Sequence, residues 1–228
     1  KGGALNIIQH REIHGKIKTL TLKREPSGKW YALLSVEKKR VETVQKTTNS
    51  VALDLGLHHY YADSEGAFLE NPRYLRKSEQ KLAQAQRRHS QKKKGSKNRQ
   101  KSRLKLARIY ERIANQRNDF LHKESRKLVT LFSTIAIEKL SIKKMLRNRY
   151  LAKSISDAAW RKFQHMLAYK AEEAGSKLLE VDARGTSQYC ICGNRVEKTL
   201  AVRIHRCNAC GLETDRDTMS ALLIQQIA

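Results

Sequence analysis

The sequence predicts an α/β protein, and three observations lead to this prediction. Short apolar runs typical of strands recur along the chain, stretches with helical periodicity separate the later runs, and a cysteine-rich stretch precedes the last helix. The chain has 228 residues, of which 39% are hydrophobic, which is enough to bury a core. We therefore expect one large or two smaller folded domains rather than disorder.

The amino-terminal part, Ile17 to Val44, has the alternating pattern of β-strands. Pro26–Gly28 provides a turn between two such runs, so we expect a small β element with basic edges. The compact apolar run Val51–Leu57 predicts another strand. The turn Asp63–Gly66 then predicts a hairpin, with a third strand through Ala67–Leu69.

Beyond Pro72, helix-forming residues dominate and carry a dense basic block. Between Lys81 and Arg108 there are twelve Lys and Arg residues and no acidic residue. Gly95-Ser96 predicts a turn between two helices, the second running from about Asn98 to Leu131. A solvated helical hairpin is one interpretation; we favour nucleic-acid contact, because such a block repels itself unless phosphates neutralise it. The residues expected to bind nucleic acid are Arg87, Arg88, Lys92, Lys93, Lys94, Lys97, Arg99, Lys101 and Arg103.

The second half of the chain alternates strands and helices. The run Leu131–Leu140 predicts a strand, Ser154–Asp157 predicts the cap of a helix that Gly175 ends, and Lys177–Val181 predicts another strand. A last short helix follows the cysteines. Strand, hairpin, strand, helix, strand, helix, strand, helix is the order of an RNase H-like domain. Three large aromatic residues are expected in the core, with base stacking as the alternative: Trp30, Trp160 and Phe163.

Three carboxylates occur in settings that suggest a shared site. Asp54 and Glu138 lie in apolar strand-like runs, where a carboxylate is costly unless a partner or metal compensates it, and Asp217 opens the last helix. Each has a structural explanation: a turn for Asp54, an ion pair with Lys139 or Arg147 for Glu138, and the helix dipole for Asp217. Together, three oxygen donors fit Mg²⁺ or Mn²⁺ better than zinc. Two such ions would support phosphodiester hydrolysis.

Three polar residues near these carboxylates stay outside the candidate set. Asp215 could contact the metal ligands without binding the metal itself, or it could cap the last helix. His58 and His59 follow the strand of Asp54, and we expect them to pack or to contact phosphate rather than act as bases.

Four cysteines form two close pairs, Cys190-Ile-Cys192-Gly and Cys207-Asn-Ala-Cys210-Gly. This spacing predicts a tetrahedral structural zinc ribbon rather than disulfides, and hence a reducing compartment. The first pair has one intervening residue instead of two, which could recruit His205 as a substitute ligand. Four free structural thiols are the alternative.

The charge balance predicts a polyanionic partner. Lys and Arg number 47 against 22 Asp and Glu, which gives a formal net charge of +25 and a pI near 10.2. No run of about 18 apolar residues occurs, so we expect no membrane-spanning helix, and the start is not a signal peptide. Since there is no initiating Met, we expect the carboxyl-terminal part of a longer protein or a processed product.

Several motifs together resemble the TnpB (OrfB) proteins of insertion sequences, from about Gly15 to Ala228. They are Leu-Asp54-Leu-Gly, Ile-Glu138-Lys-Leu, Leu151–Asp157 before Trp160, Thr186-Ser-Gln188 before the cysteines, and Asp215-Arg-Asp217. The resemblance implies a RuvC-type nuclease domain with a basic helical insertion and an inserted zinc ribbon, preceded by part of a β-barrel-like wedge domain. The expected domains are 1–48 (wedge-like), 49–185 (nuclease core with the helical hairpin 72–130), 186–214 (zinc ribbon) and 215–228 (last nuclease segment).

The resemblance also implies a function: an RNA-guided DNA endonuclease of an insertion sequence, related to type V CRISPR effectors and here lacking its amino-terminal recognition lobe. Its partners would be a guide RNA from the transposon end and target DNA, in the cytoplasm and nucleoid of a prokaryotic host. Asp54, Glu138 and Asp217 would be catalytic ligands of Mg²⁺ or Mn²⁺, and Cys190, Cys192, Cys207 and Cys210 would bind zinc. Met219 stands where the family usually has Asn.

Two other functions remain open from the sequence. One is a TnpB-derived repressor that binds RNA and DNA without cutting, and the other is a structural zinc-ribbon RNA-binding protein of the ribosomal type.

Overall fold

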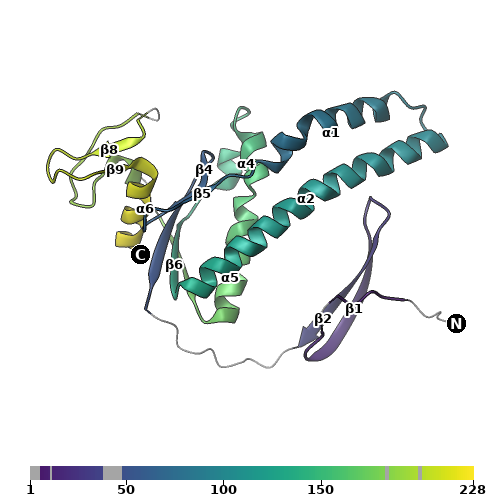
Figure 1. Cartoon of the computed structure of the whole chain (residues 1–228), viewed down its shortest axis with the longest axis horizontal. Helices are drawn as coiled ribbons and strands as arrows, with labels where there is room; N and C mark the ends of the chain where they lie inside the picture. Colours follow the sequence, from purple (N-terminus) through teal and green to yellow (C-terminus); the bar gives the residue numbers. More distant parts are fainter. Residues whose placement is uncertain (1–5, 11, 38–47, 183–184, 200–201) are drawn as a thin grey trace. The chain divides into compact units, whose positions relative to one another are not determined.

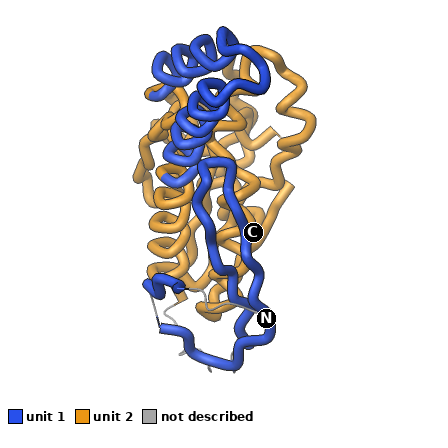
Figure 2. The backbone as a smooth tube through the Cα atoms, turned by 90° about the vertical axis from the view of Figure 1, so that its right-hand side faces the viewer, with its two compact units in different colours: residues 1–42, 78–115 blue, residues 43–77, 116–228 orange. Residues whose placement is uncertain are grey.

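The computed structural model describes residues 6–10, 12–37, 48–182, 185–199 and 202–228, and the α/β prediction is confirmed. The predicted strand residues after position 37 lie outside these ranges. By internal contacts the chain forms two compact units, one from residues 1–42 and 78–115 and the other from residues 43–77 and 116–228 (Figure 2).

The first unit contains an antiparallel hairpin of β1 (Lys16–Arg24) and β2 (Trp30–Glu37). The predicted turn at Pro26–Gly28 is confirmed: Glu25 N donates to Lys29 O, and Gly28 has a φ of 88°, which favours glycine. The prediction that Trp30 is a core residue is wrong, because Trp30 is 65% exposed on the hairpin. Periodicity identified the strand but could not show whether anything in the described chain covers that face.

A glutamate of the helix α2 (Lys97–Leu131) fixes the tip of this hairpin. Glu111 accepts hydrogen bonds from Ser27 Oγ at 3.0 Å and Tyr31 Oη at 3.3 Å. It also forms a 3.0 Å ion pair with Lys29. These three contacts lower the pKa of Glu111, the Lys29 hydrogen bond most strongly, so the carboxylate is held ionised.

The basic helical hairpin is confirmed. It consists of α1 (Tyr74–Ser90) and α2 (Lys97–Leu131), a helix of 35 residues. Between them Gly95 has a φ of 82°, so the turn lies where Gly95-Ser96 predicted it. Ser96 Oγ accepts from Arg99 N at 3.2 Å and caps the start of α2. In the first unit, His89 and Ser102 join the two helices by a 2.8 Å hydrogen bond.

The second unit is built on a mixed five-stranded sheet in the order β5-β4-β3-β6-β7 (Figure 1). Its strands β3, β6 and β7 are parallel, and β4 and β5 pair antiparallel. The strands are β3 (Ser50–Leu55), β4 (His59–Asp63), β5 (Phe68–Glu70), β6 (Thr134–Glu138) and β7 (Lys177–Val181).

Alternation along β3 and β6 assigns the two faces of this sheet. Val51, Leu53 and Ile137 pack into the main core with the last turns of α2 and with α5 (Trp160–Ala174). Ala52 and Ala136 instead pack against Ile224 of α6 (Arg216–Ile227). Figure 1 shows α5 and α6 on opposite sides of the strands.

The predicted cap at Ser154–Asp157 is wrong, because these residues lie inside a helix. After α3 (Ile142–Met145), α4 (Ala152–Ala158) ends at Ala159, whose φ of 54° breaks the path before α5 begins. Asp157 accepts hydrogen bonds from Leu75 N at 3.0 Å and Arg117 Nη2 at 2.6 Å. It therefore caps the start of α1, a partner distant in sequence that local rules cannot identify. The predicted end at Gly175 is confirmed.

The cysteine stretch contains the 3₁₀ turn Thr186–Gln188 and a two-stranded element, β8 (Ile204–Arg206) and β9 (Glu213–Asp215), directly before α6. No helix within the described ranges is long and apolar enough to span a membrane.

Candidate functional site

Asp54 and Glu138 extend from neighbouring parallel strands on the face that α6 covers. Leu53 pairs with Ile137 in the register of β3 and β6, so the two carboxylates lie one residue further along adjacent strands. By alternation they share the face of Ala52 and Ala136, which pack against α6. Gln225 of α6 donates to Ser50 Oγ at 3.1 Å and fastens the helix over β3.

The electrostatics of Asp54 link it to the other two predicted carboxylates, although among the described residues the oxygen atoms of the three do not form a group within 4.8 Å. Burial, followed by the charges of Asp217 and Glu138, raises the pKa of Asp54 to about 7, while the charge of Arg216 opposes this rise. Burial also raises the pKa of Glu138, with the charge of Asp182 as the second cause. A site that concentrates negative charge in a partly buried position favours a cation.

Asp217 lies in the first turn of α6, and two arginines contact it. Asp215 Oδ1 accepts from Asp217 N at 2.7 Å, which confirms that Asp215 can cap the helix. Arg216 donates from Nε and Nη2 to Asp217 Oδ1 at 3.2 and 3.1 Å, and Arg203 Nη1 lies 3.5 Å from Oδ2. Asp217 would exchange these cations for a metal ion if it served as a ligand.

The contacts of Glu138 and His59 test the structural roles that the sequence suggested for these two residues. Among the ion pairs of the described residues, none joins Glu138 to Lys139 or to Arg147. His59 forms a 3.0 Å contact with Glu70 and packs against Phe68, as the packing interpretation predicts.

The four cysteines come together as a compact cluster of sulfur atoms. Cys190 Sγ lies 3.6 Å from Cys210 Sγ, and Cys192 Sγ lies 3.6 Å from Cys207 Sγ. A tetrahedral zinc ion with bonds of about 2.3 Å needs sulfur atoms about 3.8 Å apart, so the donor set fits zinc. In the described part of the chain, this is the one group of His, Cys, Asp or Glu whose ligand atoms all lie within 4.8 Å.

Backbone N–H groups favour the thiolate form of Cys207, the form that binds a metal. Those of Cys210 and Ala209 lower the pKa of the Cys207 thiol, whereas burial raises the pKa of Cys190. His205 is not a member of the group; it is fully buried, and its Nδ1 lies 2.5 Å from Lys198 Nζ. Met219, at the position where Asn was expected, packs in the core with Cys190 and Cys207.

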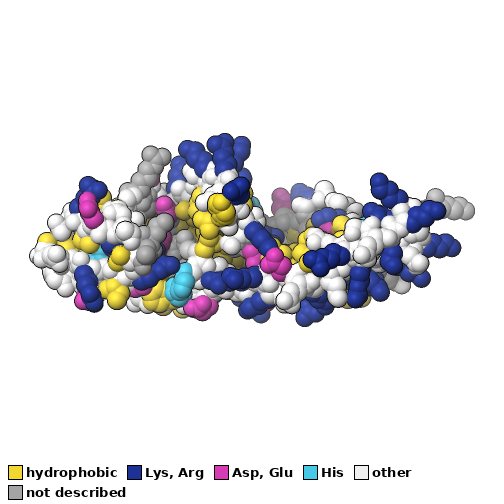
Figure 3. All heavy atoms as spheres, turned by 90° about the horizontal axis from the view of Figure 1, so that it is seen from above, with side chains coloured by type: hydrophobic (Ala, Val, Ile, Leu, Met, Phe, Trp, Pro, Cys, Tyr) yellow, Lys and Arg dark blue, Asp and Glu magenta, His cyan; other side chains and the backbone are white. Residues whose placement is uncertain are grey.

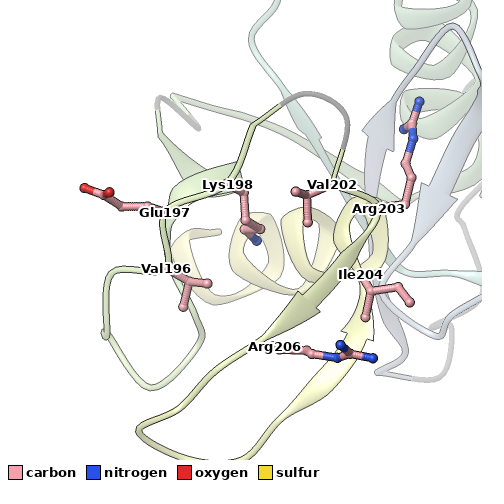
Figure 4. A pocket seen from close by; sticks show the side chains of 7 residues that line it. All are labelled: Val196, Glu197, Lys198, Val202, Arg203, Ile204 and Arg206. Atoms are coloured by element: carbon pink, nitrogen blue, oxygen red, sulfur yellow. The ribbon is translucent and has the colours of Figure 1, made fainter.

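A cavity of about 460 Å³ lies on the surface of the cysteine element (Figure 4). Apolar Val202 and Ile204 line it together with basic Lys198, Arg203 and Arg206. Because Arg203 also contacts Asp217, this cavity adjoins the third carboxylate.

The predicted nucleic-acid-binding cations lie at the end of α1, in the turn and in the first half of α2. Lys92, Lys93 and Lys94 are exposed in the turn. Arg99 is different, because its Nη1 donates to the carbonyls of His89 at 3.3 Å and Lys92 at 2.7 Å and so closes the turn. Figure 3 shows Lys and Arg side chains over much of the visible face and few acidic ones.

Comparison with known families identifies the chain. The model of the OrfB_IS605 family, described as "Probable transposase", matches residues 33–149, half of the sequence. The chain belongs to the OrfB family. A second model, described as "Cas12f1-like, TNB domain", matches residues 160–224 of this OrfB chain. The TnpB (OrfB) resemblance predicted from the motifs is thereby confirmed.

Curated relatives of the OrfB chain carry nuclease names. A "Putative RNA-guided DNA endonuclease" of Streptomyces pristinaespiralis is 39% identical over 89% of this chain and 51% of its own length. A protein of Escherichia coli K12 with the same description, InsQ, is 31% identical over 97% of this chain and 59% of its own length. The OrfB chain thus spans about half the length of these relatives.

A solved structure has a similar fold. The chain of a Cas12f1–sgRNA–target DNA complex superposes with a TM-score of 0.55 at 14% identity, covering 90% of the OrfB chain and 55% of that chain. At this identity the likeness concerns the fold alone.

Sequence reasoning missed two residues next to the candidate carboxylates of the OrfB chain. Asp182 follows β7, whose Val181 pairs with Glu138, and its charge acts on Glu138. Its position directly after an apolar strand was the available signal. Arg216 was passed over between two acidic residues, although its guanidinium contacts Asp217 and its charge lowers the pKa of Asp54.

Proposed function

We propose that this OrfB chain is the nuclease portion of an RNA-guided DNA endonuclease, with Asp54, Glu138 and Asp217 as the catalytic carboxylates. The single observation that carries the proposal is the position of Asp54 and Glu138 on adjacent strands, on the sheet face that α6 covers, with Asp217 in the first turn of that helix. The names of the two curated relatives support the same activity.

The proposed chemistry is hydrolysis of a phosphodiester bond with Mg²⁺ or Mn²⁺. Bound divalent ions lower the pKa of an attacking water and stabilise the charge of the in-line displacement. The three carboxylates would hold these ions, and their donor chemistry fits hard cations. Arg216 and Arg203 would hold the Asp217 carboxylate in position beforehand, and the cap from Asp215 would fix the turn that carries it.

The rest of the chain fits a RuvC-type nuclease with an inserted zinc ribbon. We assign residues 49–185 to the nuclease core with its helical hairpin 72–130, 186–214 to the ribbon, 215–228 to the last nuclease segment and 1–48 to a wedge-like part. The 3.6 Å sulfur separations support structural zinc. The ribbon would also brace α6, since Met219 and Leu223 pack against Cys190 and Cys207.

The proposed partners are a guide RNA and the DNA strand that it pairs with. The cations of the basic hairpin would neutralise phosphates, while guide pairing would read the sequence. The solved Cas12f1 complex of similar fold contains an sgRNA and target DNA, which supports this assignment.

The test measures cleavage of labelled single- and double-stranded DNA by the chain with Mg²⁺, with and without co-purified RNA. Asp54→Ala, Glu138→Ala and Asp217→Ala should each abolish cutting. Asp119→Ala, at an exposed carboxylate on α2 paired with Lys123, should cut like the native chain. Cutting that persists in all three site variants would refute the assignment.

The runner-up function is a repressor that binds RNA and DNA without cutting. It predicts tight, RNA-dependent DNA binding that Asp54→Ala leaves unchanged, and no cleavage under any metal condition.

A further inference from the structure

A second basic surface follows Glu138 directly, and no role has been given above to its cations. Residues 139–153, here called the basic loop, contain six Lys and Arg residues, and no acidic residue occurs between Glu138 and Asp157. The basic loop leaves the sheet at the end of β6, the edge that carries Glu138. Its cations are Lys139, Lys143, Lys144, Arg147, Arg149 and Lys153.

Packing against the core and hydrogen bonds within the loop hold the basic loop in place. Leu140, Ile142 and Met145 pack against the main core of the second unit. Asn148 Oδ1 accepts from Tyr150 N at 3.0 Å, and Asn148 O accepts from Ala152 N at 2.8 Å, so a turn fixes the position of Tyr150. One side of the loop is thereby anchored, and the opposite side presents exposed side chains.

Tyr150 is the most unusual residue of this exposed side. Its side chain is 78% exposed, and Leu146 and Leu151 beside it are also exposed. The Arg149 guanidinium lies 4.8 Å from the ring centroid, and Arg149 Nη2 donates to Tyr150 Oη at 2.7 Å. An exposed aromatic ring that a guanidinium holds in place, among cations, is the arrangement on which unpaired bases stack.

We propose that the basic loop binds single-stranded DNA, with a base stacked on Tyr150 and the neighbouring phosphates against Lys143, Lys144 and Arg147. Unpaired DNA fits because the face of a base is accessible to a side chain only outside a duplex. The strand would then continue toward Glu138, where the loop begins. The choice of DNA rather than RNA rests on the proposed function; the stacking site does not.

The first test is photo-crosslinking of the whole chain to a single-stranded oligonucleotide that contains 5-iododeoxyuridine. The protein carries Asp54→Ala and receives no added Mg²⁺, so the measurement does not depend on whether the native chain cleaves. We expect the crosslinked peptide to contain Tyr150. Crosslinks confined to other peptides, such as those with Trp30 or Tyr110, would overturn the proposal.

The second test compares affinities for the same oligonucleotide. Tyr150→Ala should weaken binding about fivefold or more, whereas Tyr150→Phe, which keeps the ring, should stay within about twofold of the parent. Tyr110→Ala, at a half-exposed tyrosine of α2, is the matched control and should leave affinity unchanged. Equal affinities of the Ala and Phe variants at position 150 would contradict stacking. Melting curves should be unaffected, because Tyr150 is exposed.

The third test separates the possible ligands. An RNA of the same sequence and a DNA duplex should respond to Tyr150→Ala less than single-stranded DNA does. Replacing Lys143 and Lys144 by Gln should lower the slope of log affinity against log salt by about 1.4, at about 0.7 per phosphate. A stronger effect of Tyr150→Ala on RNA would overturn the assignment to DNA.

Discussion

The guanidinium of Arg216 lies against the carboxylate of Asp217, the next residue in the chain, with both Nε and Nη2 within 3.2 Å of Oδ1. The same guanidinium reaches the carbonyl of Val202 at 3.4 Å, and Arg216 N donates to Arg203 O at 2.7 Å. Arg216 therefore links the cysteine element to the carboxylate that begins α6.

Removing this cation should change how the site ionises. In Arg216→Ala, the pKa of Asp54 should rise above about 7, because the positive charge that stabilises its ionised form is lost. The pH midpoint of metal-dependent cleavage should move upward and more Mg²⁺ should be needed. Arg216→Lys should recover part of the shift, and Arg195→Ala, an exposed arginine of the cysteine element, should show none. An unchanged midpoint in Arg216→Ala would contradict this role.

Asp54 should make the metal-free protein less stable as pH rises. Its folded pKa is about 7 against a usual value of 3.8, so between these pH values the folded state holds a proton that the unfolded state has released. The free energy of unfolding therefore falls from about pH 4 to about pH 7, by at most about 4 kcal/mol at about 1.4 per pH unit.

Asp54→Asn removes that titration. Without Mg²⁺, the variant should melt at a higher temperature than the native chain at pH 8, and the difference should vanish near pH 4. Thermal melts at several pH values measure it. A native chain that is the more stable of the two at pH 8 would show that Asp54 is not held in an unfavourable environment.

The cysteine cluster should hold one zinc ion, and its loss should loosen α6. Cys207→Ser should abolish zinc binding and lower the free energy of unfolding by about 3 kcal/mol or more, because structural zinc contributes directly to folding. His205→Gln should retain zinc, since His205 lies outside the sulfur cluster. Metal content by mass spectrometry checks both variants, and zinc loss in His205→Gln would show that the histidine is a ligand.

The exposed lysines of the hairpin turn should govern salt-dependent RNA binding. Replacing Lys92, Lys93 and Lys94 by Gln should lower the slope of log affinity against log salt by about 2 to 3, at about 0.7 to 0.9 per phosphate. Arg99→Ala should also lower the melting temperature, because Arg99 closes the turn through two carbonyls. Filter-binding titrations at several salt concentrations provide the slopes, and Lys123→Gln, whose lysine is paired with Asp119, is the control.

Asp157 should matter for stability far more than an exposed acid. Asp157→Ala would leave the partly buried guanidinium of Arg117 without its carboxylate and remove the cap of α1, at a cost of about 3 kcal/mol. Asp119→Ala, in an exposed pair of the same helix, should cost less than about 1 kcal/mol. Urea unfolding of the two variants compares them directly.

Local sequence signals accounted for most elements of the fold. Alternation predicted β1 and β2, a compact apolar run predicted β3, and a turn predicted the hairpin that contains β4. Gly95 and Gly175 located a turn and a helix end, and helix-forming residues in and around the basic block predicted both long helices. The α/β class followed from their order. The failures share a cause: Trp30, Ala159 and Asp157 depend on what surrounds them in space, which neither periodicity nor capping rules contain.

The candidate site could be predicted only in part for a similar reason. Asp54 and Glu138 became candidates because each stands in an apolar strand, and Asp217 joined them as part of a set. Their arrangement follows from strand register and from α6 lying over one face of the sheet. Asp182 and Arg216 were missed because their settings are ordinary in sequence. Their effects on the site are electrostatic and become apparent only once the strands are paired.

The position of α6 over β3 also sets the order in which the protein can mature on the ribosome. Asp54 is synthesised well before Asp217 and before the Gln225 that fastens α6 to Ser50. A nascent chain can thus pair its strands and form the basic hairpin while its three carboxylates are still apart. The site is complete only after α6 has left the exit tunnel, so translation itself delays its assembly.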